Sequence, residues 1–417
     1  MLFSLVTTTI VLVSLLIATS AWSLIRNYAI ARKIGLPIIV VPFSHENPIW
    51  MLTARHVMPL VKYIPVGNGH FTRFGYTGFQ FHDKYHMHQE LGDGVVIVTP
   101  GKNWIYVCNA DAIHDVIRRE RQGEFARPVE LLAMLDVFGP NLSTVSATSF
   151  GLSSINGAGI DADSMQTNGA DWQRQRKCTA TSFNEQTNAL VWYESLRQGQ
   201  QLLEHWRNAD ARKSSTLAQD TKTLTLDVLV RAAFGKSFDF HNAQDKTTTL
   251  GPLSYRDALA IVLENAILIL ALGPDTLKRL SFIPGLSRVS DAANQFRKYM
   301  SDMFDEHSEA TAQKQQPAQG NLITSLVCAS VEYKLLSRDE VIGNMFVYNF
   351  AGHDTTAHSF AFTFMLLAAN PEVQEWMVEE INYVVTDKQT SETQYNLYPR
   401  LVRTLAVLVR FLSPTSF

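Results

Sequence analysis

The chain has 417 residues, of which 46% are hydrophobic and 18% are charged, and its formal net charge is -3. This composition is typical of a folded globular protein and excludes a disordered or fibrous chain. The nearly neutral charge excludes a broad basic face, so we expect no nucleic acid partner. The length suits one large domain or two ordinary ones.

The N-terminal 25 residues form an apolar run that contains no charged residue. About twenty apolar residues in a helix span the core of a bilayer, so residues 1–25 are predicted to be a transmembrane anchor. The first basic residues all follow this run: Arg26, Arg32 and Lys33. Because positive charge stays on the cytosolic side, we expect a single-pass anchor with the rest of the chain in the cytosol. The alternative is a cleaved signal peptide, with its cleavage site among the small residues near 18–21.

Residues 26–70 are predicted to be a linker and membrane-proximal segment. Pro37 and Pro42 flank a short apolar stretch at 38–41, which the pattern indicates is part of this linker. Further on, two runs rich in β-branched and aromatic residues, 94–99 and 104–108, predict a hairpin. A helix should follow the hairpin.

Two kinds of side chain near the hairpin could have a special role. Asn109 or Asp111 can cap the helix that follows the hairpin. His82, His86 and His88 lie near the end of a short predicted helix, and the first two would share a helical face at a spacing that metal ligands also use. Since no carboxylate or cysteine stands at a partner spacing, we expect these histidines to be exposed and not to bind a metal.

From about residue 171 the pattern is almost wholly helical. Two polar stretches interrupt the rest of the chain, at 143–168 and at 310–320. The sequence therefore predicts a mainly α protein with a small β-sheet near its N-terminus. No internal repeat is visible.

The most informative predicted helix runs from about residue 338 to residue 369. Ser337 and Glu340 form an S-x-x-E capping box at its start, and Asn370-Pro371 ends it. At 1.5 Å per residue such a helix is about 48 Å long, enough to cross a domain. It is apolar on nearly every side, which predicts that it is buried.

A short polar segment, residues 351–356 (A-G-H-D-T-T), lies in the middle of this helix. A glycine removes bulk so that another group can approach the backbone, and a threonine hydroxyl can bond back to a carbonyl and open the helix locally. The segment therefore predicts a small polar groove. One alternative is a polar patch that meets a neighbouring helix. Another takes Asp354 and His358 as metal ligands, although no third ligand is evident.

A second motif lies on an earlier helix, where Trp172 and Arg176 follow the pattern W-x-x-x-R. Side chains four residues apart share one helical face. An arginine on such a face pairs well with a carboxylate. Alone the motif is weak, because Trp/Arg helix faces are common.

The two motifs, in this order, resemble the cytochrome P-450 (haem-thiolate monooxygenase) family of the microsomal type. The resemblance implies a P-450-like fold that follows an N-terminal transmembrane helix. It implies a haem cofactor, with Trp172 and Arg176 binding a propionate. It also implies an oxygen-binding groove at Ala351 and Gly352, with Asp354 and Thr355 as the acid–alcohol pair that steers protons to iron-bound oxygen.

The resemblance further implies a function. Members of the family insert one oxygen atom from O2 into a small apolar substrate, with electrons from a membrane-bound NADPH-cytochrome reductase. We therefore expect a monooxygenase of secondary metabolism in the endoplasmic reticulum membrane. The substrate is not indicated, because pocket residues lie on variable loops.

The sequence departs from the family pattern after Leu408. The family's E-x-x-R helix and its haem-cysteine loop should follow, yet Val409-Arg410 leads into a short tail. None of the three cysteines, Cys108, Cys178 and Cys328, lies in such a loop, and they form no C-x-x-C pair. Because the axial thiolate favours O–O cleavage, residues 71–417 are expected to be a partial cytochrome P-450 domain that is inactive as given.

Residues 145–167 are small and polar and are interpreted as an insertion in the family pattern. Val145-Ser146 and Val409-Arg410 are residue pairs that a splice donor sequence would encode, so both departures could be translated introns. Two other hypotheses stay open. One is a non-catalytic, membrane-anchored remnant that binds a partner or a hydrophobic ligand; the other is an unrelated helical membrane protein.

Overall fold

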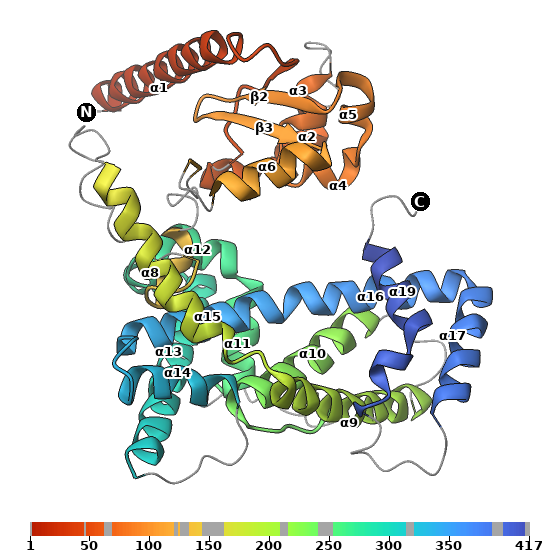
Figure 1. Cartoon of the computed structure of the whole chain (residues 1–417). Coiled ribbons are helices and arrows are strands. Elements are labelled where there is room, and N and C mark those ends of the chain that lie inside the picture. The colour runs from red at the N-terminus through yellow and green to blue at the C-terminus, as the bar shows by residue number, and fades with distance from the viewer. Residues whose placement is uncertain are drawn as a thin grey trace. The chain divides into compact units, whose positions relative to one another are not determined.

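A computed structural model gives the fold of most of the chain. It divides the chain into two compact units, Met1–Ala126 and Arg127–Phe417. The residues that the structure describes are 2–45, 47–61, 69–120, 124–125, 133–143, 162–208, 216–240, 253–313, 321–385 and 395–412. Helices dominate, with one small sheet, which confirms the predicted class (Figure 1).

The sheet of the first unit contains the predicted hairpin. Strands β2 (Gly94–Val98) and β3 (Asn103–Val107) are antiparallel, which confirms the hairpin to within one residue at each end. Strand β1 (Ile38–Val40) pairs in parallel with β2, so the sheet order is β1-β2-β3. The short stretch around β1 is therefore a strand, which differs from the predicted linker. Its pairing with a distant strand is a non-local contact that the local pattern does not encode.

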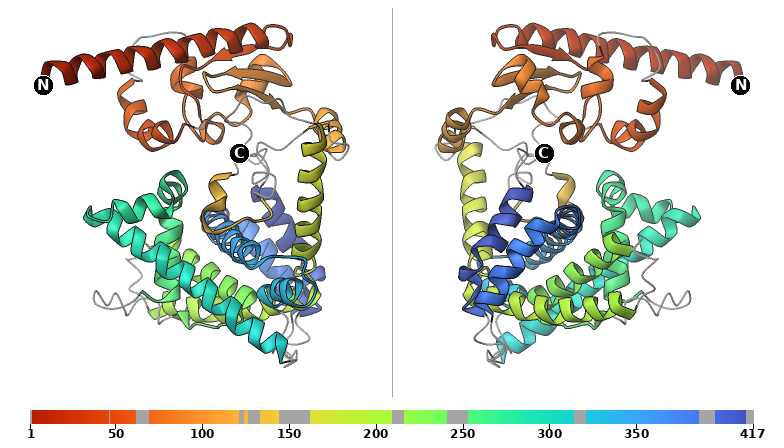
Figure 2. Two further views of the ribbon diagram at one scale, coloured as in Figure 1. Left: turned by 90° about the vertical axis from the view of Figure 1, so that its left-hand side faces the viewer. Right: turned by 90° about the vertical axis from the view of Figure 1, so that its right-hand side faces the viewer.

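Helix α1 (Leu2–Ala31) continues past the predicted end of the anchor at residue 25. Its portion Thr7–Ala31 is long and apolar enough to cross a membrane, by length and composition. The C-terminal end of α1 packs on one face of the sheet, where Ala31 meets Val96 and Val98 (Figures 1 and 2). The helix is therefore joined directly to the sheet.

Short helices cover the other face of the sheet. Alternate residues of a strand point to opposite sides, so Val95 and Ile97 face these helices. Val95 and Ile97 pack there against Phe74 and Phe79. The remaining helices of this unit are α2 (Pro48–Val61), α3 (His70–Phe74), α4 (Phe79–Asp83), α5 (His86–Leu91) and α6 (Ala110–Glu120). Asn109 caps α6 by accepting a hydrogen bond from the backbone N–H of Ala112 at 3.0 Å.

The histidines near this sheet are placed differently from the prediction. His82 belongs to α4 and His86 begins α5, and Lys84 between them has a φ of 53°. The prediction that the two share one helical face is therefore wrong, since a left-handed residue breaks the helix. The expected exposure is confirmed for His82 and His86, whereas His88 is half-buried.

The second unit is a bundle of helices. They are η1 (Ala133–Phe138), α8 (Ala162–Ala180), α9 (Glu185–Asn208), α10 (Leu217–Phe234), α11 (Tyr255–Glu264), α12 (Ala266–Arg279), α13 (Pro284–Ala312), α14 (Leu322–Val331), α15 (Arg338–Gly352), α16 (Asp354–Ala369), α17 (Pro371–Val384), η5 (Tyr398–Arg400) and α19 (Val402–Leu412). Fully buried Phe296, Met300 and Met345 lie in a core to which α10, α11, α13, α14 and α15 contribute. Of the predicted insertion, residues 145–161 lie outside the described residues and 162–167 begin α8.

The long predicted helix is two helices, α15 and α16, which meet at His353 and run nearly in line (Figure 1). The capping box of Ser337 and Glu340 is confirmed, and so is the end at Asn370. The expected burial holds only for α15. In α16, Phe362 and Met365 are each 51% exposed, because α10, α17 and α19 contact α16 over only part of its surface.

The segment after η1 crosses α15 at Gly343. A Cβ atom on Gly343 would lie 2.3 Å from the carbonyl oxygens of Gly139 and Pro140. Next to this crossing, the side-chain oxygen of Asn344 accepts a hydrogen bond from the backbone N–H of Leu142 at 2.9 Å. The backbones can approach this closely only because residue 343 lacks a side chain.

We expect Gly343→Ala to destabilise the second unit, because the new methyl group meets backbone that cannot move aside cheaply. Overpacking of this kind costs about 1–3 kcal/mol or more. The matched control is Gly199→Ala in α9, where a Cβ would meet nothing within 4 Å. That change should raise stability by about 0.5–1 kcal/mol through helix propensity. Thermal unfolding of the detergent-solubilised variants measures both effects, and equal midpoints would contradict the close approach.

Candidate functional site

Helix α8 docks on the first turns of α15 through a partly buried polar contact. The carboxylate of Glu340 accepts hydrogen bonds from Arg174 Nη2 at 2.7 Å and from Gln175 Nε2 at 2.8 Å. Asn344 Nδ2 donates to Gln175 Oε1 at 3.0 Å. Burial opposes the charge of Glu340. The hydrogen bonds from Arg174, Gln175 and the Ser337 N–H outweigh that effect and lower the pKa of the carboxyl. The site's two helices are thereby fixed to each other.

The W-x-x-x-R pair lies on α8, outside this contact. The guanidinium carbon of Arg176 is 5.3 Å from the centre of the Trp172 ring, which confirms that the two side chains share a face. Arg176 is exposed and Trp172 is half-buried. The neighbouring Arg174, in contrast, is committed to Glu340 and Asp171. Of these two arginines, Arg176 is therefore the one that can reach a ligand.

The A-G-H-D-T-T segment lies at the junction of α15 and α16. Thr355 Oγ1 donates a hydrogen bond to the carbonyl oxygen of Ala351 at 2.7 Å, as predicted for a threonine that bonds back along the helix. The helix is interrupted between them, at His353. Ala351 and Thr355 are both exposed, and they lie one turn apart on the same side. This junction therefore presents a small residue and a hydroxyl to solvent.

The other side of the junction packs against α10. A Cβ on Gly352 would lie 3.1 Å from the side chain of Leu229, so the glycine admits α10 and does not lie on the exposed face with Ala351. His353 is buried, and its Nδ1 lies 3.4 Å from the hydroxyl of Thr225. The alternative prediction, a polar patch that meets a neighbouring helix, thus describes Gly352 and His353.

Asp354 faces a small cavity beside α10 and α11. Its Oδ1 lies 3.4 Å from Nζ of Lys222. The cavity has a volume of about 100 Å³, and its lining includes Lys222, Arg256, His353 and Asp354. Sequence reasoning missed Lys222 and Arg256, because no local motif marks a residue that reaches the site from another helix.

The metal hypothesis finds no support in the described residues. His358 Nδ1 lies 2.7 Å from the backbone carbonyl oxygen of Asp354, so the ring is turned toward its own helix. Across the described part of the chain, no three His, Cys, Asp or Glu side chains gather in a way that could hold a metal ion.

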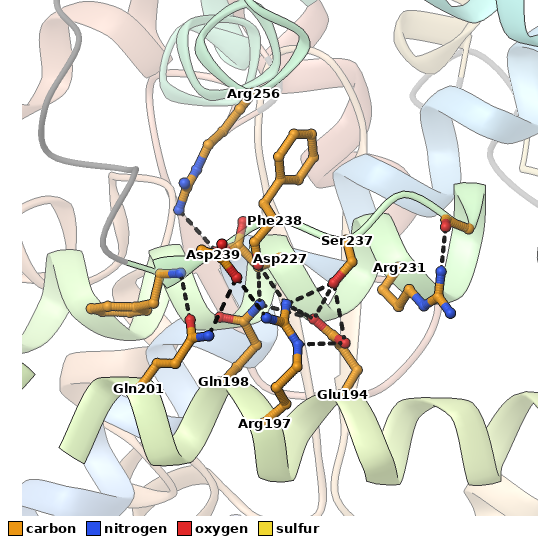
Figure 3. Close-up of polar contacts among 12 residues, drawn as sticks. Glu194, Arg197, Gln198, Gln201, Asp227, Arg231, Ser237, Phe238, Asp239 and Arg256 are labelled. Atoms are coloured by element: carbon orange, nitrogen blue, oxygen red, sulfur yellow. Dashed lines mark hydrogen bonds and ion pairs between the residues drawn. The ribbon is translucent and has the colours of Figure 1, made fainter. Parts of the chain in front are cut away.

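A polar network holds α10 in place behind the junction (Figure 3). Arg197 of α9 pairs with Glu194 at 2.6 Å and with Asp239, beyond the end of α10, at 2.8 Å. Arg256 of α11 reaches Asp227 of α10 at 3.1 Å. Burial raises the pKa of Asp227 to about 6, although the charge of Arg256 opposes the rise. The helix that carries Lys222 is thus tied to both neighbours.

All three cysteines of the chain lie within the described residues. Cys178 is buried in α8 and Cys328 lies half-buried in α14, and burial raises the pKa of both thiols. A raised pKa disfavours the thiolate form that binds iron. Cys108 is exposed after β3, in the first unit.

Comparison with known proteins gives the family of these motifs. The family model described as "Cytochrome P-450" matches residues 143–408, more than half of the chain. The chain is 28% identical to a cytochrome P-450 monooxygenase (ORF6) of Penicillium roqueforti, over 86% of this chain and 60% of that protein. It is 26% identical to a phomenoic acid biosynthesis cluster cytochrome P-450 monooxygenase of Leptosphaeria maculans, over 96% of this chain and 69% of the relative. A third relative, the cytochrome P-450 monooxygenase prx9 of Penicillium rubens, is 27% identical over 86% of this chain and 60% of its own length. The chain thus spans about three fifths of the length of the first and third relatives.

The buried His353 predicts a pH dependence of stability. Burial lowers its pKa to about 4, from a usual value near 6.5. The unfolded chain therefore binds more protons between these values, so this residue's contribution to stability falls as the pH drops from about 6.5 to 4, by at most about 3 kcal/mol. His353→Gln should remove this part of the acid sensitivity. Asp227, with its raised pKa, acts in the opposite direction and is present in both proteins.

The measurement is the thermal midpoint of the chain and of His353→Gln at a series of pH values. We expect the midpoint of the unaltered chain to fall relative to that of His353→Gln as the pH drops from about 6.5 to 4. A constant difference from pH 7 to pH 4 would show that His353 does not titrate in this range.

Proposed function

Since the chain belongs to the cytochrome P-450 family, we propose that it is part of a haem-thiolate monooxygenase that oxidises a small apolar organic substrate. When bound, haem supplies the activation of O2. The observation that carries the proposal is that one helical unit holds both motifs, the Trp172–Arg176 pair and the exposed Ala351–Thr355 face. Glu340 connects the helices that bear them.

Arg176 and Trp172 fit a haem propionate. The exposed guanidinium can donate a charge-assisted hydrogen bond to a carboxylate, and the Trp172 ring beside it limits where that charge can move. Ala351 offers little bulk, so a flat cofactor and a small molecule can approach this side of the junction. Gly352, which faces α10, would contribute by keeping the junction narrow.

Asp354 and Thr355 fit a proton relay. The Thr355 hydroxyl donates its hydrogen bond to the carbonyl oxygen of Ala351. The hydroxyl oxygen of Thr355 can therefore accept a hydrogen bond from a proton donor on the exposed face. Asp354 faces the polar cavity near Lys222, from which protons can reach its carboxylate. The acid and the alcohol would thus pass protons from the cavity side of the helix to the open side.

We infer that the thiolate that would hold the iron is none of Cys108, Cys178 and Cys328, because none of them lies in a haem-cysteine loop. We therefore expect the 417-residue chain by itself to give no haem-thiolate spectrum with carbon monoxide and no NADPH-dependent oxidation. The alternative function is a non-catalytic, membrane-anchored protein that binds a partner or a hydrophobic ligand. The exposed apolar side chains of α16, such as Phe362 and Met365, favour that alternative.

The proposed setting is the endoplasmic reticulum membrane, with residues 1–25 as a single-pass anchor and the remainder facing the cytosol. Residues 26–70 would be the membrane-proximal segment and residues 71–417 part of a cytochrome P-450 domain, with an insertion at 145–167. The electron donor would be an NADPH-cytochrome reductase. The name of the Leptosphaeria relative, which refers to a biosynthesis cluster, supports a role in secondary metabolism.

Arg176→Ala should weaken haem binding without unfolding the chain, because the side chain is exposed and lies beside the Trp172 ring. Loss of one charge-assisted hydrogen bond corresponds to about 1.5–3 kcal/mol, or roughly tenfold or more in affinity. Titration of haem into the purified chain, followed by absorbance, measures the effect. The control is Arg174→Ala, which should lower the unfolding midpoint because Glu340 loses its cationic partner. If Arg176→Ala binds haem like the unaltered chain, the propionate assignment is wrong.

Thr355→Ala should uncouple oxygen consumption from product formation in a form of the protein that includes the axial cysteine. Removal of the hydroxyl takes away the group that holds the proton on the open face, so most of the consumed oxygen should appear as peroxide or water. Thr356→Ala, at the adjacent exposed threonine, is the matched control and should leave coupling intact. Measured ratios of product to oxygen consumed that are equal for both variants would refute the acid–alcohol pair.

A further inference from the structure

The end of helix α1 is fastened to the turn of the β2–β3 hairpin by one buried side chain. Asn27 Nδ2 donates hydrogen bonds to the carbonyl oxygens of Thr99 at 2.9 Å and of Pro100 at 3.2 Å. The carbonyl oxygen of Asn27 accepts a hydrogen bond from Asn103 Nδ2 at 3.0 Å. Asn27 is only 7% exposed. The turn therefore lies at the same level along α1 as residue 27.

From this point α1 runs along the hairpin toward its open end. Ala31, one turn further along the helix, packs with Val96 and Val98. Beyond the helix, Leu36 lies against Gly94 at the start of β2, where a Cβ would come within 3.3 Å of it. The turn is thus the part of the hairpin nearest to the apolar portion of α1, and the open end is the part furthest from it.

Aromatic and basic side chains of α1 gather around residue 27. Trp22 is 72% exposed and Tyr28 is 40% exposed. Trp and Tyr gather at the interface between bilayer and water. Arg26 lies between them and is the first charged residue of the chain. A membrane anchor that reaches the interface at these residues, and that is fastened to the turn at Asn27, would carry that turn into the headgroup layer.

The Lys and Arg residues around the end of α1 and the hairpin turn have no acidic residue beside them in these segments. Residues 1–45 and 94–110 contain no Asp or Glu. The basic residues in these two segments are Arg26, Arg32, Lys33 and Lys102. Basic groups at a membrane surface are attracted by anionic phospholipids within about one Debye length, roughly 10 Å.

We propose that the turn at 99–102 lies in the headgroup layer and that Lys102, with the basic end of α1, binds the headgroups of anionic phospholipids. This inference rests on the proposed anchoring by α1. It does not depend on haem or on catalysis. Asn27 is the positioning residue, since it carries the turn to the membrane surface.

The two ends of the hairpin provide a matched pair of probe sites. Cys108 is a natural exposed cysteine just beyond β3, at the open end. Gly101→Cys, combined with Cys108→Ala, moves the label to the turn, and Cys178→Ala and Cys328→Ala remove the other thiols. Each full-length protein carries an environment-sensitive fluorophore and is reconstituted in vesicles that contain a headgroup-labelled quencher lipid. We expect strong quenching at position 101 and weak quenching at 108, because a strand of five residues separates them by about 16 Å.

Two lipid mixtures identify the partner. Quenching at position 101 should be greater in phosphatidylcholine with phosphatidylserine than in phosphatidylcholine alone, and high salt or Lys102→Gln should remove the increase. Asn27→Ala should reduce quenching at 101, whereas Asn109→Ala, which removes the cap of α6, should leave it unchanged. Equal quenching at 101 and 108, or equal quenching in the two mixtures, would overturn the proposal.

Alkaline extraction distinguishes this failure from failure of the anchor. Protein that stays in the vesicles at high pH but shows equal quenching at both sites contradicts the placement of the turn alone. Protein that is released refutes the anchoring and this inference with it. A haem titration on the same samples reports on the monooxygenase proposal separately.

Discussion

The carboxylate of Glu340 joins the two helices that carry the proposed haem-binding motifs. It accepts hydrogen bonds from Arg174 and Gln175 of α8 and from the backbone N–H of Ser337 at the start of its own helix. A carboxylate that is largely withdrawn from water is costly unless its oxygens are bonded, and the hydrogen bonds from α8 meet this need. The W-x-x-x-R pair and the exposed junction between α15 and α16 therefore depend on one residue that belongs to neither motif.

At the junction of α15 and α16, the two sides of the long helix have different roles. Gly352 and His353 serve the contact with α10, where the missing side chain admits Leu229 and the imidazole lies near a threonine. Ala351 and Thr355 remain on the exposed side. Thr355 donates a hydrogen bond to the carbonyl oxygen of Ala351 across the interruption at His353. The polar motif thus packs against α10 on one side and is open to solvent on the other.

Those features that the sequence predicted depend on neighbouring residues. The hairpin followed from strand-forming runs around a turn, and the capping box from residues three apart. The features that it missed depend on distant partners: β1 pairs with a strand far along the chain, and Lys222 reaches Asp354 from another helix. The W-x-x-x-R spacing selected Arg176 in the sequence, and the structure adds that the nearby Arg174 is bonded to Glu340 and Asp171.

The uneven burial of α15 and α16 shows why an apolar pattern is not sufficient to place a core. Both helices are apolar around most of their circumference, so the pattern predicted one buried rod. In α15, Met345 and Phe346 are buried by helices from several directions. In α16, Phe362 and Met365 stay half exposed, although their side chains are equally suited to a core. Composition indicates which side chains would gain free energy from burial. Whether such a side chain is buried depends on how many helices pack around it.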